Sequence, residues 1–349
     1  TTGSAILVLR WVLVHAAEIP ISAISAVVDL VQIQIFFLKY LRQFAKQTAA
    51  MLFGWLRQLD VRDAEVTIPG ERGFGRTASD ARRNVIERLR LIAVPLGEFA
   101  PDQLKAYLRE IAQERDRWKI KEIRPFSKVI APVAPAELAD LVLSSLIEKR
   151  ERRGRRDRLM ERAFTFEDSD YLPASPAQPP FLDLLESNSA EGLRLIRTLV
   201  VEAITFNTNG REPGDDGFTV DLSQGPRFFP WTRSYLWSRD QSHEYSAASG
   251  LKALEAWSQQ RLDDGAPVDV VLTDILGPEG SCAAYLLVAI DVLLSHFDIG
   301  RDALASFIAD PELLATDRAR QIHDQIGSGI DQFSIGREPD GKFKLADLK

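Results

Sequence analysis

Apolar residues recur at helical spacing along most of the chain. Between residues 189 and 204, Leu193, Ile196 and Leu199 fall on one face of a helix and charged residues fall on the other. Similar spacing predicts helices over 5–18, 19–38, 36–59, 101–117, 136–149, 179–186, 245–262, 282–297, 302–309 and 311–325. The segment 282–297 is almost wholly apolar, so we expect it to be a central, buried helix. The pattern predicts a mainly α fold.

A Pro-rich bend precedes two helices between residues 171 and 204. Pro179 and Pro180 start the first helix, and Ser189 is the predicted N-cap of the second. Two helices joined by a short turn form an αα-hairpin, the unit of helical solenoids. Residues 244–297 repeat this order of helix, Gly/Pro turn and helix. We expect αα-hairpins arranged as a solenoid or as an irregular helical bundle.

Two β-type segments interrupt the helical pattern near residues 218–237. FTVDL and RFFPWTRSYLW flank SQGP, which predicts a small inserted β-hairpin with Gly225 in its turn. Pro230 confines the second strand to an edge or ends it, because proline donates no ladder hydrogen bond. A further short strand is predicted over 64–68, and 268–276 fits either a short helix or a strand.

Several turns are predicted from proline, serine and glycine. Pro125, Pro132 and Pro135 predict a loop, and Ser79 is a predicted helix N-cap. The segment FTFEDSDYLPASPAQPP, from 164 to 180, is rich in Pro, Ser and Asp, as domain boundaries often are. We therefore expect an N-terminal helical region over 1–163 and a helical-repeat-like region over 164–349 that carries the hairpin.

The most hydrophobic stretch, residues 19–38, is long enough to suggest a membrane span. However, Ser22, Ser25 and Asp29 recur along one helical stripe within it. An Asp in the middle of a bilayer costs about 2.5–3.5 kcal/mol on insertion scales. A buried helix in a large bundle is therefore the better prediction.

Composition narrows the functional classes. The 349 residues are 45% hydrophobic and 27% charged, with a formal net charge of −7, so the chain has no general attraction for nucleic acid. The single Cys282 excludes an intramolecular disulfide and a Cys-rich zinc site, and fits a reducing compartment. Four scattered histidines show no metal-ligand spacing. The start TTGSAILVL lacks Met, so we expect a piece of a longer protein.

An Arg-rich segment follows the helix over 136–149. Arg150 to Arg158 include Arg152, Arg153, Arg155 and Arg156, interleaved with acidic residues. Such a mixture favours a solvated helix or linker. A phosphate-binding surface is the alternative, although no aromatic stacking partners accompany these arginines.

The second half carries a cluster of aromatic and basic residues. Phe228, Phe229, Trp231, Tyr235 and Trp237 lie close together in the sequence. They would pack the hairpin onto helices or, alternatively, stack a base or ring. Candidate interaction residues here are Arg233, Trp237 and Arg239, and with His243 they mark where a cleft would lie if the protein were an enzyme.

Two short patterns match catalytic or cofactor motifs without their companions. Gly73, Gly75 and Ala78 fit the loose G-x-G-x-x-A fingerprint, but no convincing βαβ unit surrounds them. Ser249 and Lys252 have S-x-x-K spacing, yet no K-T-G or S-D-N occurs. The chain also lacks G-x-x-x-x-G-K-[ST], H-E-x-x-H and G-x-S-x-G. We expect no catalytic, metal or cofactor residues.

Two stretches carry a family resemblance. YLPASPAQPPFLDLLESNSAEGLRLIRTLVVEAI, and the stretch from RFFPWTRSYLW to VLLSH, resemble the helical region of very large bacterial P-loop NTPases. These look like signal-transducing NTPases, a kind that includes anti-phage defence sensors. The resemblance covers about 160–325 and rests on Pro173, Pro176, Pro180, Trp237, Gly277 and Gly280. The family's ATPase motifs have no counterpart, so no nucleotide-site residue is carried over.

The resemblance implies a segment outside the NTPase module that recognises or relays a trigger. We therefore expect a non-catalytic helical scaffold or sensor that binds a protein partner, or other domains of the same polypeptide, through a groove between helix pairs. We expect it in the cytoplasm, away from membranes. An enzyme with its site near Arg233–His243 and a nucleic-acid-binding module using Arg150–Arg158 are the alternatives. Polar side chains converging near Trp237 would favour the enzyme, and a continuous positive groove would favour the nucleic-acid module.

Overall fold

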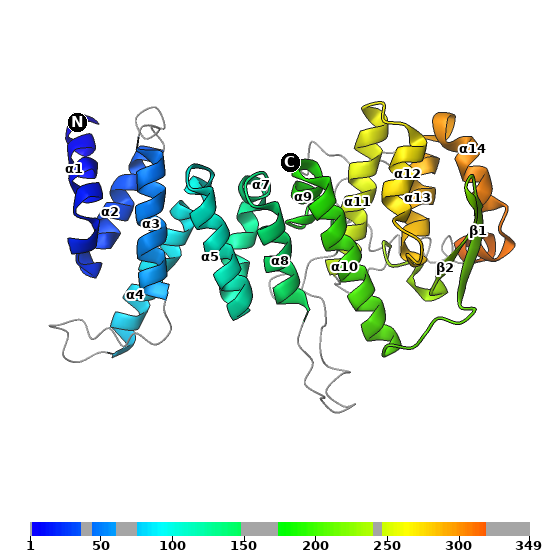
Figure 1. Cartoon of the computed structure of the whole chain (residues 1–349), viewed down its shortest axis with the longest axis horizontal. Coiled ribbons are helices and arrows are strands. Elements are labelled where there is room, and N and C mark those ends of the chain that lie inside the picture. The colour runs from blue at the N-terminus through cyan, green and yellow to red at the C-terminus, as the bar shows by residue number, and fades with distance from the viewer. Residues whose placement is uncertain (1, 36–43, 61–74, 148–173, 240–245, 319–349) are drawn as a thin grey trace, which may run out of the picture. The chain divides into compact units, whose positions relative to one another are not determined.

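The chain is mainly helical, and its described residues include a two-stranded antiparallel sheet, as the patterning predicts (Figure 1). The computed structural model describes residues 2–35, 44–60, 75–147, 174–239 and 246–318. The chain divides into two compact units, Thr1–Leu141 and Val142–Lys349. The predicted short strand over 64–68 lies outside the described residues.

The first unit contains only helices within its described residues. Its α-helices are α1 (Thr2–Val14), α2 (Ile21–Ile35), α3 (Ala45–Asp60), α4 (Gly75–Ala93), α5 (Pro101–Glu114), α6 (Arg117–Ile123), α7 (Ser127–Ile130) and α8 (Pro135–Leu146), the last running past the division. Short 3-10 helices span Ala16–Glu18, Pro95–Phe99 and Arg124–Phe126.

Helix α2 corresponds to the hydrophobic stretch considered as a membrane span. Two residues of its polar stripe contact α4, where Arg88 donates hydrogen bonds to the Ser25 hydroxyl (2.9 Å) and to the Asp29 carboxylate. Val28 and Val31 on α2 are fully buried. No helix among the described residues is both long and apolar enough to cross a membrane. Ser25 and Asp29 therefore take part in the packing of α2 against α4.

Two local predictions in the first unit are wrong. The predicted loop at Pro125 is largely helical, because the Asp116 carboxylate accepts hydrogen bonds from the backbone N–H groups of Trp118 (3.1 Å) and Lys119 (3.3 Å) and so caps α6. Pro125 then lies at the start of a 3-10 helix, where it sacrifices no helical hydrogen bond. Ser79 is not an N-cap, because α4 already begins at Gly75.

The second unit combines several helices with the hairpin in its described residues. They are α9 (Phe181–Ser187), α10 (Ser189–Thr208), β1 (Gly217–Leu222), β2 (Gly225–Pro230), α11 (Ser246–Asp263), α12 (Val268–Leu276), α13 (Ala284–Ser295) and α14 (Phe297–Ile308). A 3-10 helix spans Thr232–Ser234, and residues 311–318 are also helical. The ambiguous segment 268–276 is thus a helix.

Helices α9 and α10 form the predicted αα-hairpin. The N-cap of α10 is Asn188, one residue before the predicted Ser189, and its side chain accepts a hydrogen bond from the Glu191 N–H (3.2 Å). Gly192 lets the helices approach closely, since a Cβ there would lie 2.8 Å from the Leu185 nitrogen. The apolar face of α10 predicted from the sequence is buried, so this pair is confirmed.

Helices α11 and α13 are the most buried elements of the second unit. Helix α11 packs against α9, α10, α12 and α13, and α13 also packs against α14. Every residue of α13 from Ala284 to Leu293 is buried, as the apolar run predicts. His296 ends this helix, with its Nδ1 3.1 Å from the Val292 carbonyl oxygen and its Nε2 3.1 Å from the Asp263 carboxylate. This agrees with its predicted position near the helix C-terminus.

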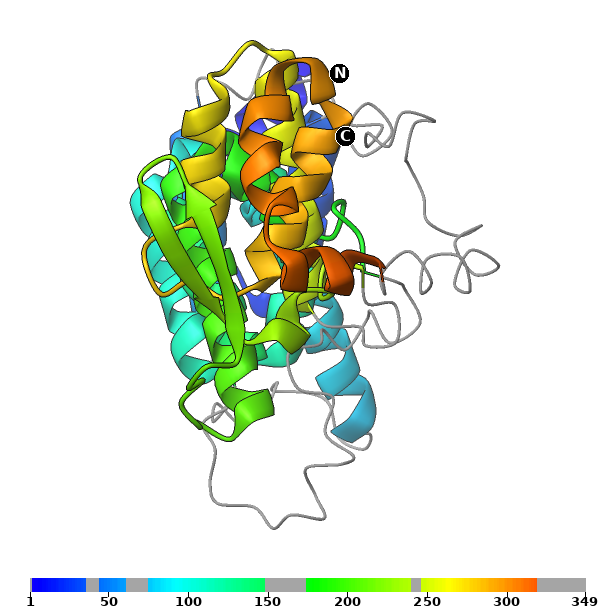
Figure 2. The ribbon, with the colours of Figure 1, turned by 90° about the vertical axis from the view of Figure 1, so that its right-hand side faces the viewer.

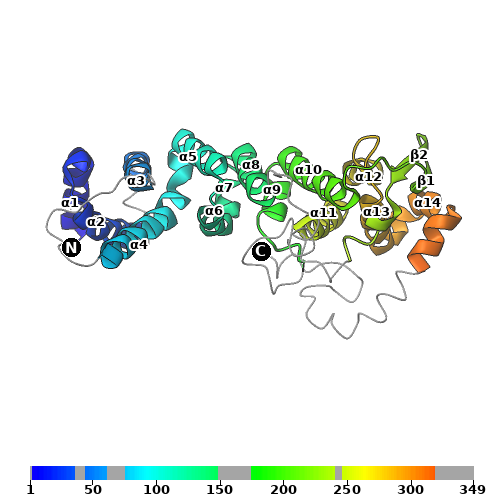
Figure 3. The same ribbon diagram turned by 90° about the horizontal axis from the view of Figure 1, so that it is seen from below.

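The β1–β2 hairpin lies beside α14 (Figures 2 and 3). Gly217 pairs with Pro230 and Leu222 pairs with Gly225 across the ladder. The tight turn is made by Ser223 and Gln224, so Gly225 directly follows it with φ +114°. Strand β2 ends at Pro230, as predicted.

Candidate functional site

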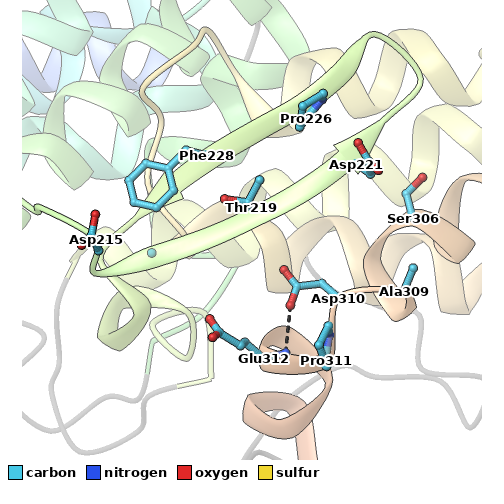
Figure 4. Close-up of a pocket in the computed structure, with 11 residues that line it drawn as sticks. Asp215, Thr219, Asp221, Pro226, Phe228, Ser306, Ala309, Asp310, Pro311 and Glu312 are labelled. Atoms are coloured by element: carbon cyan, nitrogen blue, oxygen red, sulfur yellow. Dashed lines mark hydrogen bonds between the residues drawn. The ribbon is translucent and has the colours of Figure 1, made fainter.

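The outward face of the hairpin forms one wall of an open groove of about 730 Å³ (Figure 4). Strand side chains alternate between faces. Phe218 and Val220 point into the core, whereas Thr219 and Asp221 are exposed. The register places Thr219 opposite Phe228. The outward face is therefore a polar and aromatic surface laid over an apolar inner face.

A glycine allows an aromatic ring to lie flat along this wall. A Cβ at Gly217 would lie 2.4 Å from Cζ of Phe228 and 2.5 Å from the Phe229 carbonyl oxygen, so the Phe228 ring occupies the space above Gly217. Phe228 remains 37% exposed, while its neighbour Phe229 is fully buried. The groove thus presents an aromatic surface to solvent.

The opposite wall comes from the end of α14 and the turn after it. Ser306, Ala309, Asp310, Pro311 and Glu312 line this side. Asp310 caps the helix over 311–318: its Oδ1 accepts hydrogen bonds from the N–H groups of Glu312 (2.8 Å) and Leu313 (3.1 Å). Leu313 is buried at 1% exposure, which holds this turn in place.

The groove carries only negative formal charge. Of the 11 described residues that line it, Asp215, Asp221, Asp310 and Glu312 are acidic, and none is Lys, Arg or His. The next residue along, Asp216, has a different role. Its Oδ1 accepts hydrogen bonds from the Thr232 N–H (3.1 Å) and hydroxyl (2.5 Å), which closes the base of the hairpin. Asp215 is left facing the groove.

The hairpin is fastened to the end of α12 on its other side. Arg227 donates hydrogen bonds to the carbonyl oxygens of Leu276 (3.0 Å), Gly277 (3.0 Å) and Pro278. Its guanidinium lies 4.5 Å from the centre of the Phe229 ring, and burial lowers its pKa from the ordinary value. The last carbonyls of a helix carry negative partial charge, so a cation is favoured there.

The sequence-predicted interaction residues do not gather at this groove. Arg239 is 13% exposed; it pairs with Asp291 and lies 3.6 Å from the Glu255 carboxylate, which is fully buried. Arg233 is exposed, donates to the Asn207 carbonyl oxygen (3.2 Å) and lies 5.7 Å from the Trp231 ring centre.

The remaining predicted residues are more scattered. Trp237 is half-buried in the turn that follows Thr232–Ser234. Arg152, Arg153, Arg155 and Arg156 lie outside the described residues, as does His243. The phosphate-binding and enzyme alternatives therefore rest on residues that are partly outside the described chain.

The S-x-x-K match has a structural explanation, and the G-x-G-x-x-A match lies partly outside the described residues. Ser249 accepts a hydrogen bond from the Ser175 N–H (3.1 Å), and Lys252 donates to the Ala174 carbonyl oxygen (3.0 Å). Both S-x-x-K side chains thus hold the chain segment that leads into α9. Gly73 lies outside the described residues.

The single cysteine and its neighbour are buried. Burial raises the pKa of Cys282 to about 11 and the pKa of Tyr285 well above its ordinary value. Within the described ranges, no group of three or more His, Cys, Asp and Glu side chains is arranged to hold a metal ion.

Sequence reasoning missed the groove residues Asp215, Asp221, Phe228 and Glu312. The alternation F-T-V-D-L does place Thr219 and Asp221 on the outward face of a strand. The sequence contains no signal that brings the end of α14 alongside this strand. This groove lies between a hairpin and a helix end.

No protein-family model matches the chain, and no curated protein matches it either.

Proposed function

We propose that this chain is a non-catalytic helical scaffold or sensor that acts by recognising a protein. The observation that carries this proposal is the open groove beside β1. It combines an exposed aromatic ring, a strand face with alternating outward side chains, and a helix-capping turn as the second wall. Extended peptides commonly bind along the exposed edge or face of a sheet.

Rigidity of the groove supports recognition. Arg227 ties the hairpin to α12, Asp216 closes its base, and the Ala283 N–H donates to the Pro230 carbonyl oxygen (2.8 Å). A surface held in one conformation loses less conformational entropy on binding. The groove is therefore ready to bind without rearrangement of its walls.

We further propose that the chain is part of a larger bacterial NTPase that acts in stress or anti-phage defence in the cytoplasm. This part of the proposal rests on the resemblance carried by the Pro-rich bend and by Trp237, Gly277 and Gly280. Both glycines have positive φ (+67° and +84°), so a side chain would strain the turn after α12. The turn is also where Arg227 anchors the hairpin.

Two experiments test the two parts separately. The reading frame that encodes this chain should also encode a G-x-x-x-x-G-K-[ST] loop, and a reading frame without one overturns the NTPase assignment. To test protein recognition, a photo-crosslinking amino acid replaces Thr219 in the groove. In the matched control, the same amino acid replaces the exposed Asp269 on α12. In cells, a discrete protein adduct should form from position 219 only. Equal adducts from both positions, or none from 219, overturn recognition at this groove.

A further inference from the structure

We propose that the occupant of the groove is an extended protein segment bearing Lys or Arg side chains. This inference rests on the proposed function and adds the chemistry of the partner. It starts from the outward face of β1–β2, whose side chains Thr219, Asp221 and Phe228 are exposed within the described structure.

Charge complementarity identifies the sign of the partner. Four carboxylates line the groove, and no Lys, Arg or His lines it among the described residues. Like charges held close together repel, and a cation placed among them relieves that repulsion. The same carboxylates repel nucleic acid and anionic lipid surfaces.

The distribution of the carboxylates favours a chain of cations over a single ion. Asp215 precedes β1 by two residues and Asp221 lies near the other end of the strand, while Asp310 and Glu312 lie across the groove (Figure 4). The described residues contain no group arranged to hold one metal ion. A ligand that pairs with carboxylates at both ends of the groove carries positive charge at more than one point along it.

The period of the lining residues favours an extended conformation. On the hairpin side the groove is lined by residues 215, 217, 219 and 221, every second position along the chain. A strand advances about 3.3 Å per residue, so the six residues of β1 provide a wall about 20 Å long. A segment of about six residues would fit this length.

Phe228 favours Lys or Arg in a second way. Long basic side chains pack their stems on apolar surface and place the cation over aromatic rings. This chain uses the same contact internally, where Arg261 lies 4.4 Å from the centre of the Trp257 ring. A basic side chain lying over Phe228 would reach Asp215 or Asp221 with its charged end.

The test measures binding of defined peptides to the full chain by fluorescence anisotropy. The probe is a labelled 12-residue peptide in which Arg alternates with Thr, and Glu replaces Arg in the comparison peptide. The variant Asp215→Asn/Asp221→Asn/Glu312→Gln removes three charges and retains Asp310 as the helix cap. The matched control, Asp264→Asn/Asp269→Asn, removes two exposed carboxylates away from the groove.

We expect the Arg peptide to bind the wild type, to bind more weakly as salt rises, and to lose at least about tenfold in affinity with the groove variant. The control variant should bind as the wild type does, and the Glu peptide should not bind. Thermal melts confirm that each variant is folded. If the groove variant unfolds, hydrogen exchange of the wild type takes the place of this comparison. The Arg peptide should then protect the β1 amides from exchange.

Three results overturn the inference: no binding of the Arg peptide to the wild type, equal binding to the groove and control variants, or equal protection by spermine, a polycation without an extended backbone. Its failure is distinguishable from failure of protein recognition. If position 219 still forms its specific adduct when the three charges are removed, recognition stands and the basic segment is wrong.

Discussion

The anchor between the hairpin and α12 makes the sharpest prediction about stability. Replacing Arg227 by Met keeps an unbranched apolar side chain and removes the guanidinium, which lies over the Phe229 ring. Two of its hydrogen bonds to backbone carbonyls are 3.0 Å long, and hydrogen bonds from a charged donor contribute about 1.5–3 kcal/mol each. Because the side chain is partly exposed, water replaces part of this loss. We expect the second unit to lose about 2–3 kcal/mol of unfolding free energy.

That loss should be visible by two measurements. For a unit of this size, about 2–4 °C of melting temperature accompanies each kcal/mol, so the Arg227→Met midpoint should fall by about 4–12 °C. Hydrogen exchange of the β1 and β2 amides should accelerate more than that of α13. The matched control is Arg233→Met, which removes an exposed arginine with a single 3.2 Å bond to Asn207 and should cost about 0.5 kcal/mol. Equal effects of the two substitutions would refute the anchoring role.

Three further predictions concern the second unit. Asn188→Ala should lower the free energy of unfolding in urea by about 1 kcal/mol, because α10 loses its N-cap, whereas Ser189→Ala should change this free energy little. A larger loss from Ser189→Ala than from Asn188→Ala would show that Ser189 is the cap. Arg239→Met leaves the carboxylate of Asp291 without that arginine and should cost about 3–5 kcal/mol in the same assay, an effect under 1 kcal/mol contradicting the pairing. Cys282 should resist thiol reagents at pH 8 until urea unfolds the chain. Burial raises the pKa of Cys282 from 9.0 to about 11, so the unfolded state loses the thiol proton at a lower pH than the folded state does. The free energy of unfolding should therefore fall as pH rises from 9 to 11, and a Cys282→Ala variant should lack this part of the pH dependence.

Local periodicity was sufficient to predict most helices of the second unit, although it left 268–276 open between a helix and a strand. The apolar face of α10 and the uniformly apolar α13 are buried as expected, because each signal lies within one element. Boundaries were less predictable, since Asn188 and Ser189 are both good caps and the backbone selects the first. The prediction of a loop at Pro125 was wrong for a similar reason, because proline suits the first turn of a helix as well as a loop.

The groove could be predicted only in part. Alternation in β1 places Thr219 and Asp221 on one face, but the second wall requires Ser306 to Glu312 to lie beside it. That proximity depends on the packing of α13 against α14 and of α14 against β1, which are long-range contacts. Basic residues are conspicuous in the sequence, so Arg239 was predicted to interact outwardly; in the structure it pairs with Asp291 and is 13% exposed.

The arginine anchor also bears on the order in which the second unit assembles. An isolated two-stranded hairpin is marginally stable in water, so β1–β2 depends on what it is fastened to. The acceptors for Arg227 are the last carbonyls of α12 and the turn after it, which exist in that arrangement only once α12 has formed. The hairpin should therefore be a late addition to a helical nucleus. Its sequence alone, transplanted to another protein, would not reproduce the groove without α12 and α14.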